Sequence, residues 1–192
     1  MYNEIISAIN KLLDSSEKDV IIVAIDGPSS AGKSNLANIL GQNFCCNIFH
    51  MDDFFLTAEL RTPQRLAEAG GNVDYDRFAR EILENVIHKN DFSYGIYDCR
   101  ALSTKPSEKI FHKRLNIVEG VYSNHPTLED YYDFKVFLDV NSTVQLERIA
   151  KRNGEFLFNR FKDEWIPLEN AYFEKLEIQD NCDVLFDTTN LY

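Results

Sequence analysis

The sequence has no apolar run that approaches the roughly 20 residues required to cross a membrane. Its first residues, MYNEIISAINKLLDSSEKD, lack the basic and then apolar layout of a secretion signal. Basic residues are outnumbered, since 20 Lys and Arg stand against 31 Asp and Glu and give a formal net charge of −11. Such a field repels polyanions. We therefore expect a cytoplasmic protein that has neither a membrane nor a nucleic acid as its partner.

Cysteine is present but not in a pattern that suggests metal binding or disulfides. None of Cys45, Cys46, Cys99 and Cys182 forms a C-x-x-C pair or a metal-ligand spacing. Free cysteine is among the most often buried residue types. We therefore predict four reduced thiols that serve as small core residues, with Cys45 and Cys46 on a buried strand.

The 192 residues, of which 44% are hydrophobic and 27% charged, are enough for one domain with a sizeable core, residues 1–192. Ile5, Ile9 and Leu12 recur at helical spacing, which predicts an amphipathic helix within residues 1–18. No repeat or linker interrupts the chain.

Beyond this helix, short apolar runs alternate with helical segments, which favours an α/β fold with a parallel central sheet. FSYGIYDCRALSTKPSEKIFHKR has no helical period and predicts a hairpin or extended flap. The predicted strands are residues 20–25, the apolar run in FCCNIFHMDDFFL, and the runs LNIVEG, KVFLDV and CDVLFDTT. The predicted helices are residues 34–40 with Gly41 as the C-terminal cap, a short helix that Pro63 opens, and residues 76–88. Two more are predicted, one from its N-cap Ser142 to Gly154 and one around Pro167.

The segment from Gly27 to Ser34, GPSSAGKS, has the spacing G-x-x-x-x-G-K-S between a predicted strand and a predicted helix. Glycines let successive backbone N–H groups point at phosphates, and the helix dipole adds to their attraction. In such a loop Lys33 reaches the β- and γ-phosphates, and the hydroxyl of Ser34 ligates Mg²⁺. We therefore expect a P-loop NTPase fold of three layers, α/β/α, that binds an NTP and Mg²⁺; the loop alone leaves open whether the nucleotide is ATP or GTP. The expected nucleotide contacts are Gly27, Ser29, Ser30, Ala31, Gly32, Lys33, Ser34 and Asn35.

Acidic residues follow several of the predicted strands. Asp52 and Asp53 follow the second, Glu119 ends the third, and Asp139 closes the fourth, where a turn or helix cap is an equal alternative. Ligands of parallel sheets collect at the carboxyl ends of strands. Phosphoryl transfer to a hydroxyl needs Mg²⁺ and a carboxylate that takes the proton of the attacking oxygen. The expected metal ligands are Ser34, Asp52 and Glu119.

Arginines lie on both sides of a short turn near the C-terminal end. Arg148 and Arg152 are four residues apart and share a helix face, and Arg160 follows the turn NGEFLFN. This arrangement predicts a lid, about residues 148–160, whose guanidinium groups stabilise transition-state charge and exclude water. The alternative is a solvated basic face paired with neighbouring glutamates.

Two further segments offer contacts to an acceptor molecule. In GGNVDYDRF, Asp74 is placed to accept hydrogen bonds from ribose-type hydroxyls, or else to cap a helix. In SYGIYDCR, Tyr97 is placed to stack on a base and Asp98 to bind a polar edge, or else Tyr97 belongs to the core.

Several segments together resemble the uridine kinase-like branch of P-loop kinases, which is related to phosphoribulokinase and to pantothenate and nicotinamide riboside kinases. They are GPSSAGKS, HMDDFFL, GGNVDYDRF, YDCR, IVEGVYS, FLDV with LERIAKR, and DEWIPLENAYFE, in the family's order from about Val20 onward. The resemblance implies that Asp52 is the catalytic base, although Asp53 stands where those enzymes more often have serine, so that either aspartate is a candidate.

The same resemblance implies that Asp74 holds the ribose hydroxyls, that Tyr97 lies near the nucleobase and that Glu119 lies near Mg²⁺. Arg148 and Arg152 match lid arginines. The chain departs from the family at Cys99, where the nucleoside enzymes have an aromatic residue, and in NVDYDRF, which is one residue shorter than the family's pattern.

The sequence therefore predicts a kinase that transfers the γ-phosphoryl group of ATP to a small hydroxyl acceptor. A nucleoside such as uridine or cytidine is the first expectation, and nicotinamide riboside or pantothenate is the alternative. Two other classes compete with the kinase: an NTP-hydrolysing switch or ATPase, and an inactive nucleotide-binding module. Whether the chain forms a homo-oligomer stays open.

Overall fold

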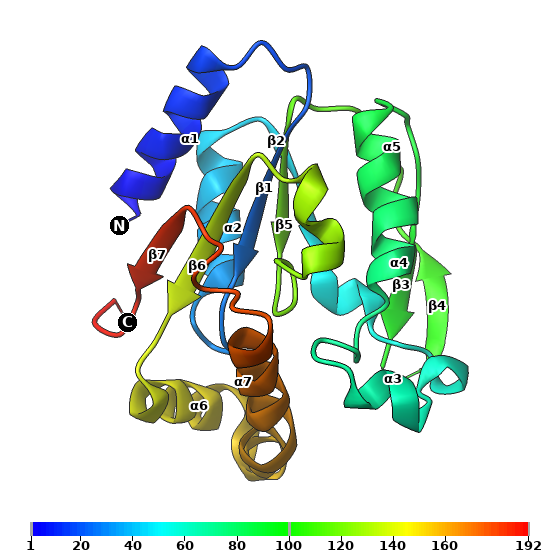
Figure 1. Cartoon of the computed structure of the whole chain (residues 1–192), viewed down its shortest axis with the longest axis vertical. Helices are drawn as coiled ribbons and strands as arrows, with labels where there is room; N and C mark the ends of the chain where they lie inside the picture. Colours follow the sequence, from blue (N-terminus) through cyan, green and yellow to red (C-terminus); the bar gives the residue numbers. More distant parts are fainter. Residues whose placement is uncertain (1, 100, 192) are drawn as a thin grey trace.

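A five-stranded parallel sheet forms the centre of the computed structural model, which describes residues 2–99 and 101–191 (Figure 1). The strand order is β2-β5-β1-β6-β7, and every neighbouring pair is parallel. The predicted α/β fold with a parallel sheet is thus confirmed. The strands are β1 Ile21–Asp26, β2 Cys46–His50, β5 Leu115–Glu119, β6 Phe134–Asp139 and β7 Val184–Asp187.

Helices cover both faces of the sheet because β1 is apolar on both sides. Ile21, Val23 and Ile25 pack with the buried side chains of helices α1 (Asn3–Ser15) and α2 (Lys33–Asn43). Ile22, which points to the opposite face, belongs to a second cluster with residues of α4, η3 and α7. The result is the predicted three-layer α/β/α arrangement, with the predicted N-terminal helix as part of one outer layer.

One long helical segment and one hairpin lie beyond β2 (Figure 1). The segment predicted at 76–88 is continuous but contains a π-helical stretch, and it buries the predicted face with Phe78, Ile82, Leu83 and Val86. The predicted hairpin is present as an antiparallel pair; Arg100 of the YDCR segment is outside the described residues. The elements are η1 Met51–Phe54, η2 Ala58–Leu60, α3 Pro63–Ala67, α4 Tyr75–Phe78, η3 Ala79–Leu83, α5 Glu84–Ile87, β3 Gly95–Asp98, β4 Ser103–Pro106 and η4 Pro126–Tyr131.

The C-terminal helices differ from the prediction in their boundaries. Helix α6 (Ser142–Arg160) begins after Asn141, whose side chain accepts a hydrogen bond from the N–H of Thr143 at 2.9 Å, so that Asn141 and not Ser142 is the cap. Gly154 has φ 73° and ψ 170°, which kinks the helix where an end was predicted. The chain then continues through a π-helical stretch, η5 (Phe161–Trp165), into α7 (Ile166–Lys175).

Two further local predictions were wrong. Gly41 does not cap α2, which continues to Asn43 and ends where Phe44 becomes extended. Of the four cysteines, which are all free, Cys45 and Cys99 are exposed and not core residues, because Cys45 precedes β2 and Cys99 follows β3. No helix among the described residues is long and apolar enough to cross a bilayer.

Gly120, which follows β5, lies very close to Met51, which follows β2. A substitution of Gly120 therefore tests how closely the two strands approach at their carboxyl ends. Its φ is 143°, and an added Cβ would lie 2.7 Å from the Cβ of Met51. We expect Gly120→Ala to lower the free energy of unfolding by about 1–3 kcal/mol, measured by urea denaturation. Gly41→Ala is the matched control, since Gly41 lies inside a helix and faces only the flexible end of Ile48; its stability should stay within about 1 kcal/mol of the parent. Equal stability of both variants would contradict the tight approach.

Candidate active site

The loop between β1 and α2 has the backbone geometry that the sequence predicts. Gly27 has φ 138°, and a Cβ there would lie 2.1 Å from the carbonyl oxygen of Leu138. Gly32 has φ 98° and directly precedes α2. Lys33 is buried, and its ammonium group donates to the carbonyl oxygens of Gly27 at 2.7 Å and Pro28 at 2.9 Å. The cation is therefore held at the loop in which phosphates would bind.

The other predicted loop residues lie at the start of α2 or beside it. Ala31 is fully buried, whereas Ser34 and Asn35 are exposed on the first helical turn. Ser30 accepts a hydrogen bond through its carbonyl oxygen from the guanidinium of Arg148 at 3.3 Å. The backbone N–H groups of a helix start attract anions. The arrangement is consistent with the predicted phosphate contacts, which stay a prediction.

A buried carboxylate that the sequence analysis missed lies at the base of this loop. Asp26 is fully buried and accepts hydrogen bonds from the N–H groups of Gly27 (2.7 Å), Tyr122 (3.2 Å) and Asn124 (2.9 Å), and from the hydroxyl of Tyr172 (2.8 Å). Burial raises its pKa to about 6, although these bonds and the charge of Lys33 oppose the shift. Asp26 thus joins the P-loop to the loop after β5 and to α7.

Three elements meet beside the P-loop at a second carboxylate. Glu119, at the end of β5 and only 5% exposed, accepts hydrogen bonds from the Ser34 hydroxyl at 3.2 Å through either oxygen. Its Oε1 also lies 2.5 Å from Nδ1 of His50 at the end of β2. This contact raises the pKa of His50. The sequence analysis missed His50, although its position opposite Glu119 follows from the parallel register.

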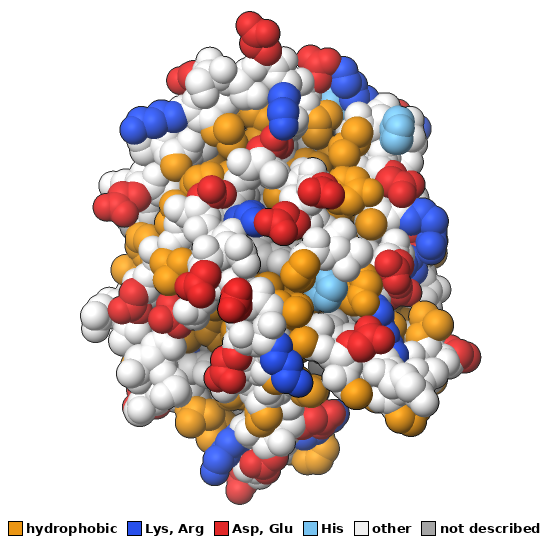
Figure 2. Space-filling model, in the orientation of Figure 1, with side chains coloured by type: hydrophobic (Ala, Val, Ile, Leu, Met, Phe, Trp, Pro, Cys, Tyr) orange, Lys and Arg blue, Asp and Glu red, His pale blue; other side chains and the backbone are white. Residues whose placement is uncertain are grey.

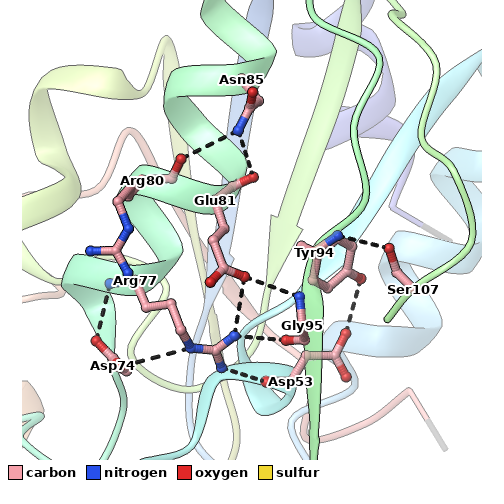
Figure 3. Close-up of polar contacts among 9 residues, drawn as sticks. All are labelled: Asp53, Asp74, Arg77, Arg80, Glu81, Asn85, Tyr94, Gly95 and Ser107. Carbon is pink, nitrogen blue, oxygen red and sulfur yellow. Dashed lines mark hydrogen bonds and ion pairs between the residues drawn. The ribbon is translucent and has the colours of Figure 1, made fainter. Parts of the chain in front are cut away.

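The neighbouring aspartates of η1 have different surroundings. The side chain of Asp52 is accessible to solvent, yet the surrounding protein reduces its hydration and raises its pKa, with Lys33 opposing and Glu119 adding to the shift. Asp53 is tied to the hairpin instead, because its Oδ2 accepts from the hydroxyl of Tyr94 at 3.0 Å (Figure 3). Asp52 is therefore the aspartate whose carboxyl is exposed to the electrostatic field of the P-loop lysine.

A magnesium ion suits the donors that converge here. The Ser34 hydroxyl and the Glu119 carboxylate are in contact, and Asp52 lies within the field of both Glu119 and Lys33. Among residues 2–99 and 101–191, no three His, Cys, Asp or Glu side chains are arranged to hold a metal by themselves. Mg²⁺ commonly binds through one or two carboxylates together with water and substrate phosphates. The residues fit such an ion, which would neutralise phosphate charge when bound.

Of the predicted acceptor residues, Asp74 lies beside Arg77, and Tyr97 and Asp98 belong to β3 of the hairpin. Asp74 caps α4, where its Oδ1 accepts from the N–H of Arg77 at 3.0 Å, and its Oδ2 lies 3.7 Å from Nε of the same arginine (Figure 3). Tyr97 is only 5% exposed in β3. Asp98 accepts from the N–H of Ala101 at 3.1 Å. Asp74 thus caps a helix and Tyr97 is a buried residue, which were the alternatives to acceptor binding for these two residues. Acceptor binding by Asp74, Tyr97 and Asp98 stays a prediction.

The three predicted lid arginines divide into two groups. Arg148 contacts the P-loop through Ser30 and donates to the carbonyl oxygen of Thr188 at 2.6 Å. Arg152 and Arg160 lie farther along α6, where Arg152 donates to the side chain of its neighbour Asn153 at 2.7 Å. Arg160 pairs with Glu164 at 2.9 Å and lies over the ring of Trp165. The structure therefore brings only Arg148 of the three into contact with the P-loop.

Helix α7 supplies a further group that the sequence analysis missed. Glu169 is 4% exposed and accepts hydrogen bonds from the backbone N–H of Ser29 at 2.9 Å and from its hydroxyl at 2.5 Å. Gln145 of α6 donates to the carbonyl oxygen of Ser29 at 3.1 Å. The only sequence signal was an acidic residue inside DEWIPLENAYFE, a segment whose contact with the P-loop is not evident from its spacing.

Solved structures of P-loop kinases share this fold. A possible uridine kinase from Bacillus stearothermophilus is 19% identical, with a TM-score of 0.70 over 96% of this chain and 98% of that one. A candidate fructose transport system kinase from Silicibacter sp. TM1040 is also 19% identical, with a TM-score of 0.73 over 97% and 98%. The resemblance to uridine kinase-like P-loop kinases is thus confirmed as a likeness of fold.

Comparisons of sequence find similarity to cytidylate kinases. Cytidylate kinase 1 of Borrelia garinii subsp. bavariensis is 26% identical over 160 residues, which cover 70% of this chain and 72% of that protein. The matches to the cytidylate kinases of Borrelia turicatae and Borrelia hermsii, both 24% identical over 105 residues, span 45% and 46% of those proteins, less than half of their length. No protein-family model matches the chain.

The buried Asp26 predicts a specific dependence of stability on pH. Its pKa is raised from 3.8 to about 6 in the folded protein, so the folded state holds the proton more tightly than the unfolded state does. Its contribution to stability is therefore fully present below about pH 4 and is lost as the pH rises through about 6, by about 3 kcal/mol in total. The measurement is urea unfolding of the wild type and Asp26→Asn between pH 4.5 and 7. A difference between the two proteins that does not change with pH would contradict this account.

Proposed function

We propose that the protein is an ATP- and Mg²⁺-dependent kinase that transfers the γ-phosphoryl group to a hydroxyl of a small molecule. The observation that carries the proposal is the contact of Ser34 with Glu119 at 3.2 Å beside the loop that holds Lys33, together with Asp52, which follows β2 in η1 and interacts electrostatically with Lys33 and Glu119. Phosphoryl transfer requires positioning of the phosphates, neutralisation of their charge and a group that orients the attacking hydroxyl. The P-loop, the Ser34–Glu119 pair and Asp52 supply these three requirements.

In this mechanism the P-loop binds the phosphates of ATP, and Asp52 acts on the acceptor hydroxyl. Lys33 leaves its contacts with the Gly27 and Pro28 carbonyls and binds phosphate oxygens, while the loop N–H groups hold the remaining ones. Asp52 accepts the proton of the acceptor hydroxyl. The hydroxyl oxygen then bonds to the γ-phosphorus of ATP, and the bond between the γ-phosphorus and the β-phosphate oxygen breaks, so that ADP leaves. The raised pKa of Asp52 makes its carboxylate a stronger base than an ordinary aspartate. Arg152 and Arg160 would exclude water as lid residues.

A hydroxyl acceptor fits the site better than a phosphate acceptor does. A phosphate acceptor, which the name cytidylate kinase implies for those relatives, brings negative charge toward Asp52 and needs free cations. Arg77, which lies beside the predicted acceptor residue Asp74, is already bound to the Glu81 carboxylate (3.3 Å) and to the carbonyl oxygens of Gly95 (2.7 Å) and Asp53 (3.0 Å) (Figure 3). We therefore favour a nucleoside such as uridine or cytidine, with nicotinamide riboside or pantothenate as alternatives, and phosphorylation of cytidylate as the second candidate.

The surface charge favours a small-molecule substrate. On the face that Figure 2 shows, lysines and arginines are scattered among acidic side chains and form no basic patch. Binding to nucleic acid depends on clustered cations that neutralise backbone phosphates. With a net charge of −11, the chain as a whole repels a polyanion, whereas the P-loop offers a single anionic ligand a local site.

The acceptor and the base are tested together by ADP release with ATP and Mg²⁺. The acceptors are uridine, cytidine, nicotinamide riboside, pantothenate and cytidine monophosphate, with a blank that contains none. We expect a hydroxyl acceptor to stimulate release and Asp52→Asn to lower kcat by about 100-fold or more, because it removes the general base. The affinity for ATP in the absence of Mg²⁺ should change by less than about threefold, since Asp52 does not hold the phosphates.

Asp53→Asn is the matched control, because Asp53 is adjacent but bonded to Tyr94. It should keep most of the activity. Loss of transfer in Asp53→Asn with normal transfer in Asp52→Asn would assign the base to Asp53. Stimulation by cytidine monophosphate alone would replace the hydroxyl acceptor with a phosphate, and high release in the blank would indicate an NTP hydrolase.

A further inference from the structure

Helix α7 contacts the N-terminal part of the P-loop and the residue directly before it. Glu169 and Tyr172 are three residues apart and therefore lie on one face of the helix. Glu169 binds the N–H and hydroxyl of Ser29 within the loop, and the hydroxyl of Tyr172 donates to Asp26 directly before it. The backbone of the loop is thus fixed by side chains of a helix more than 130 residues away in sequence, since Glu169 and Ser29 are separated by 140 positions.

Glu169 is costly to bury, which indicates that its contacts are specific. A buried carboxylate loses its hydration and needs hydrogen bonds and a nearby cation to compensate. Both are present, because burial raises the pKa of Glu169 while the charge of Lys33 and the two bonds from Ser29 lower it. The group that compensates the charge of Glu169 is therefore the lysine that would bind ATP phosphates.

The same helix continues directly from the lid. The stretch η5 immediately precedes α7, and within it the rings of Phe161 and Trp165 pack edge to face at 4.5 Å. Arg152 lies over Phe161 at 5.7 Å and Arg160 over Trp165 at 4.7 Å. The lid arginines are thus packed on aromatic rings that lead without a break into the helix bearing Glu169.

We propose that Glu169 is a positioning residue that holds Ser29 so that the P-loop binds the nucleotide phosphates, and that it links occupancy of the loop to the lid through α7. The proposal rests on nucleotide binding at the P-loop, which is part of the proposed function, but not on the identity of the acceptor. When phosphates bind, Lys33 is drawn to them and the balance of charge around Glu169 changes. The helix and the aromatic stretch before it respond to that change.

The first test measures binding of a non-hydrolysable ATP analogue with Mg²⁺ by calorimetry, without any acceptor. Glu169→Ala should weaken binding by about tenfold or more, the loss expected for hydrogen bonds to a charged group. Glu169→Gln should stay within about threefold of the wild type, because its amide can accept from the Ser29 N–H and donate to the Ser29 hydroxyl. Glu174→Ala is the matched control on the exposed side of α7 and should bind normally.

The second test uses Trp165, the single tryptophan of the chain, as a reporter of the lid. Saturation with the analogue should change its fluorescence in the wild type, and the change should fall by about half or more in saturated Glu169→Ala. Normal binding by a folded Glu169→Ala would overturn the positioning role. A full fluorescence change in that variant, or none in the wild type, would overturn the link to the lid.

A second variant and a binding assay without transfer make the results interpretable in every case. If Glu169→Ala does not fold, Ser29→Ala removes one of the two bonds and should weaken analogue binding by about threefold; unchanged binding would then overturn the proposal. Because no transfer is measured, a protein that binds the analogue but phosphorylates no hydroxyl would refute the proposed function while leaving the role of Glu169 testable.

Discussion

The structure depends on the hydrogen bonds that converge on the buried carboxylate of Asp26. They fix the end of β1, the first residue of the P-loop, the loop after β5 and helix α7 to one another. A buried carboxyl group is costly unless it is hydrogen-bonded, so these donors hold the four segments together around it. The tight turn at Gly27, which leaves no room for a side chain beside Leu138, lies directly next to this carboxylate.

Parallel topology then determines which side chains meet above this base. Because β5 lies between β1 and β2, the carboxyl ends of these three strands are neighbours. The register places His50 opposite Glu119, and the helix after β1 presents Ser34 to the same carboxylate. Asp52 comes two residues after His50 and enters the same field. Groups that are far apart in sequence thus form one polar cluster at the edge where ligands of parallel sheets bind.

The fold and the P-loop could be predicted from the sequence because their signals are local. Periodic apolar residues marked the helices, short continuous apolar runs marked the strands, and the spacing of Gly27, Gly32 and Lys33 marked the loop. Asp26 and Glu169 could not be identified in this way, since their importance comes from partners distant in the chain. The wrong predictions have the same origin, because whether Cys45 is buried depends on where β2 begins, one residue later.

The central claim is that a hydroxyl near Asp52 receives the γ-phosphoryl group. The most direct measurement is phosphorus NMR of the product formed from ATP, Mg²⁺ and the acceptor that stimulates ADP release. The account predicts one new phosphate monoester signal for each ADP formed, and no such signal with Asp52→Asn. A new phosphoanhydride signal would show a phosphate acceptor, and inorganic phosphate alone would show hydrolysis; either result would contradict the account.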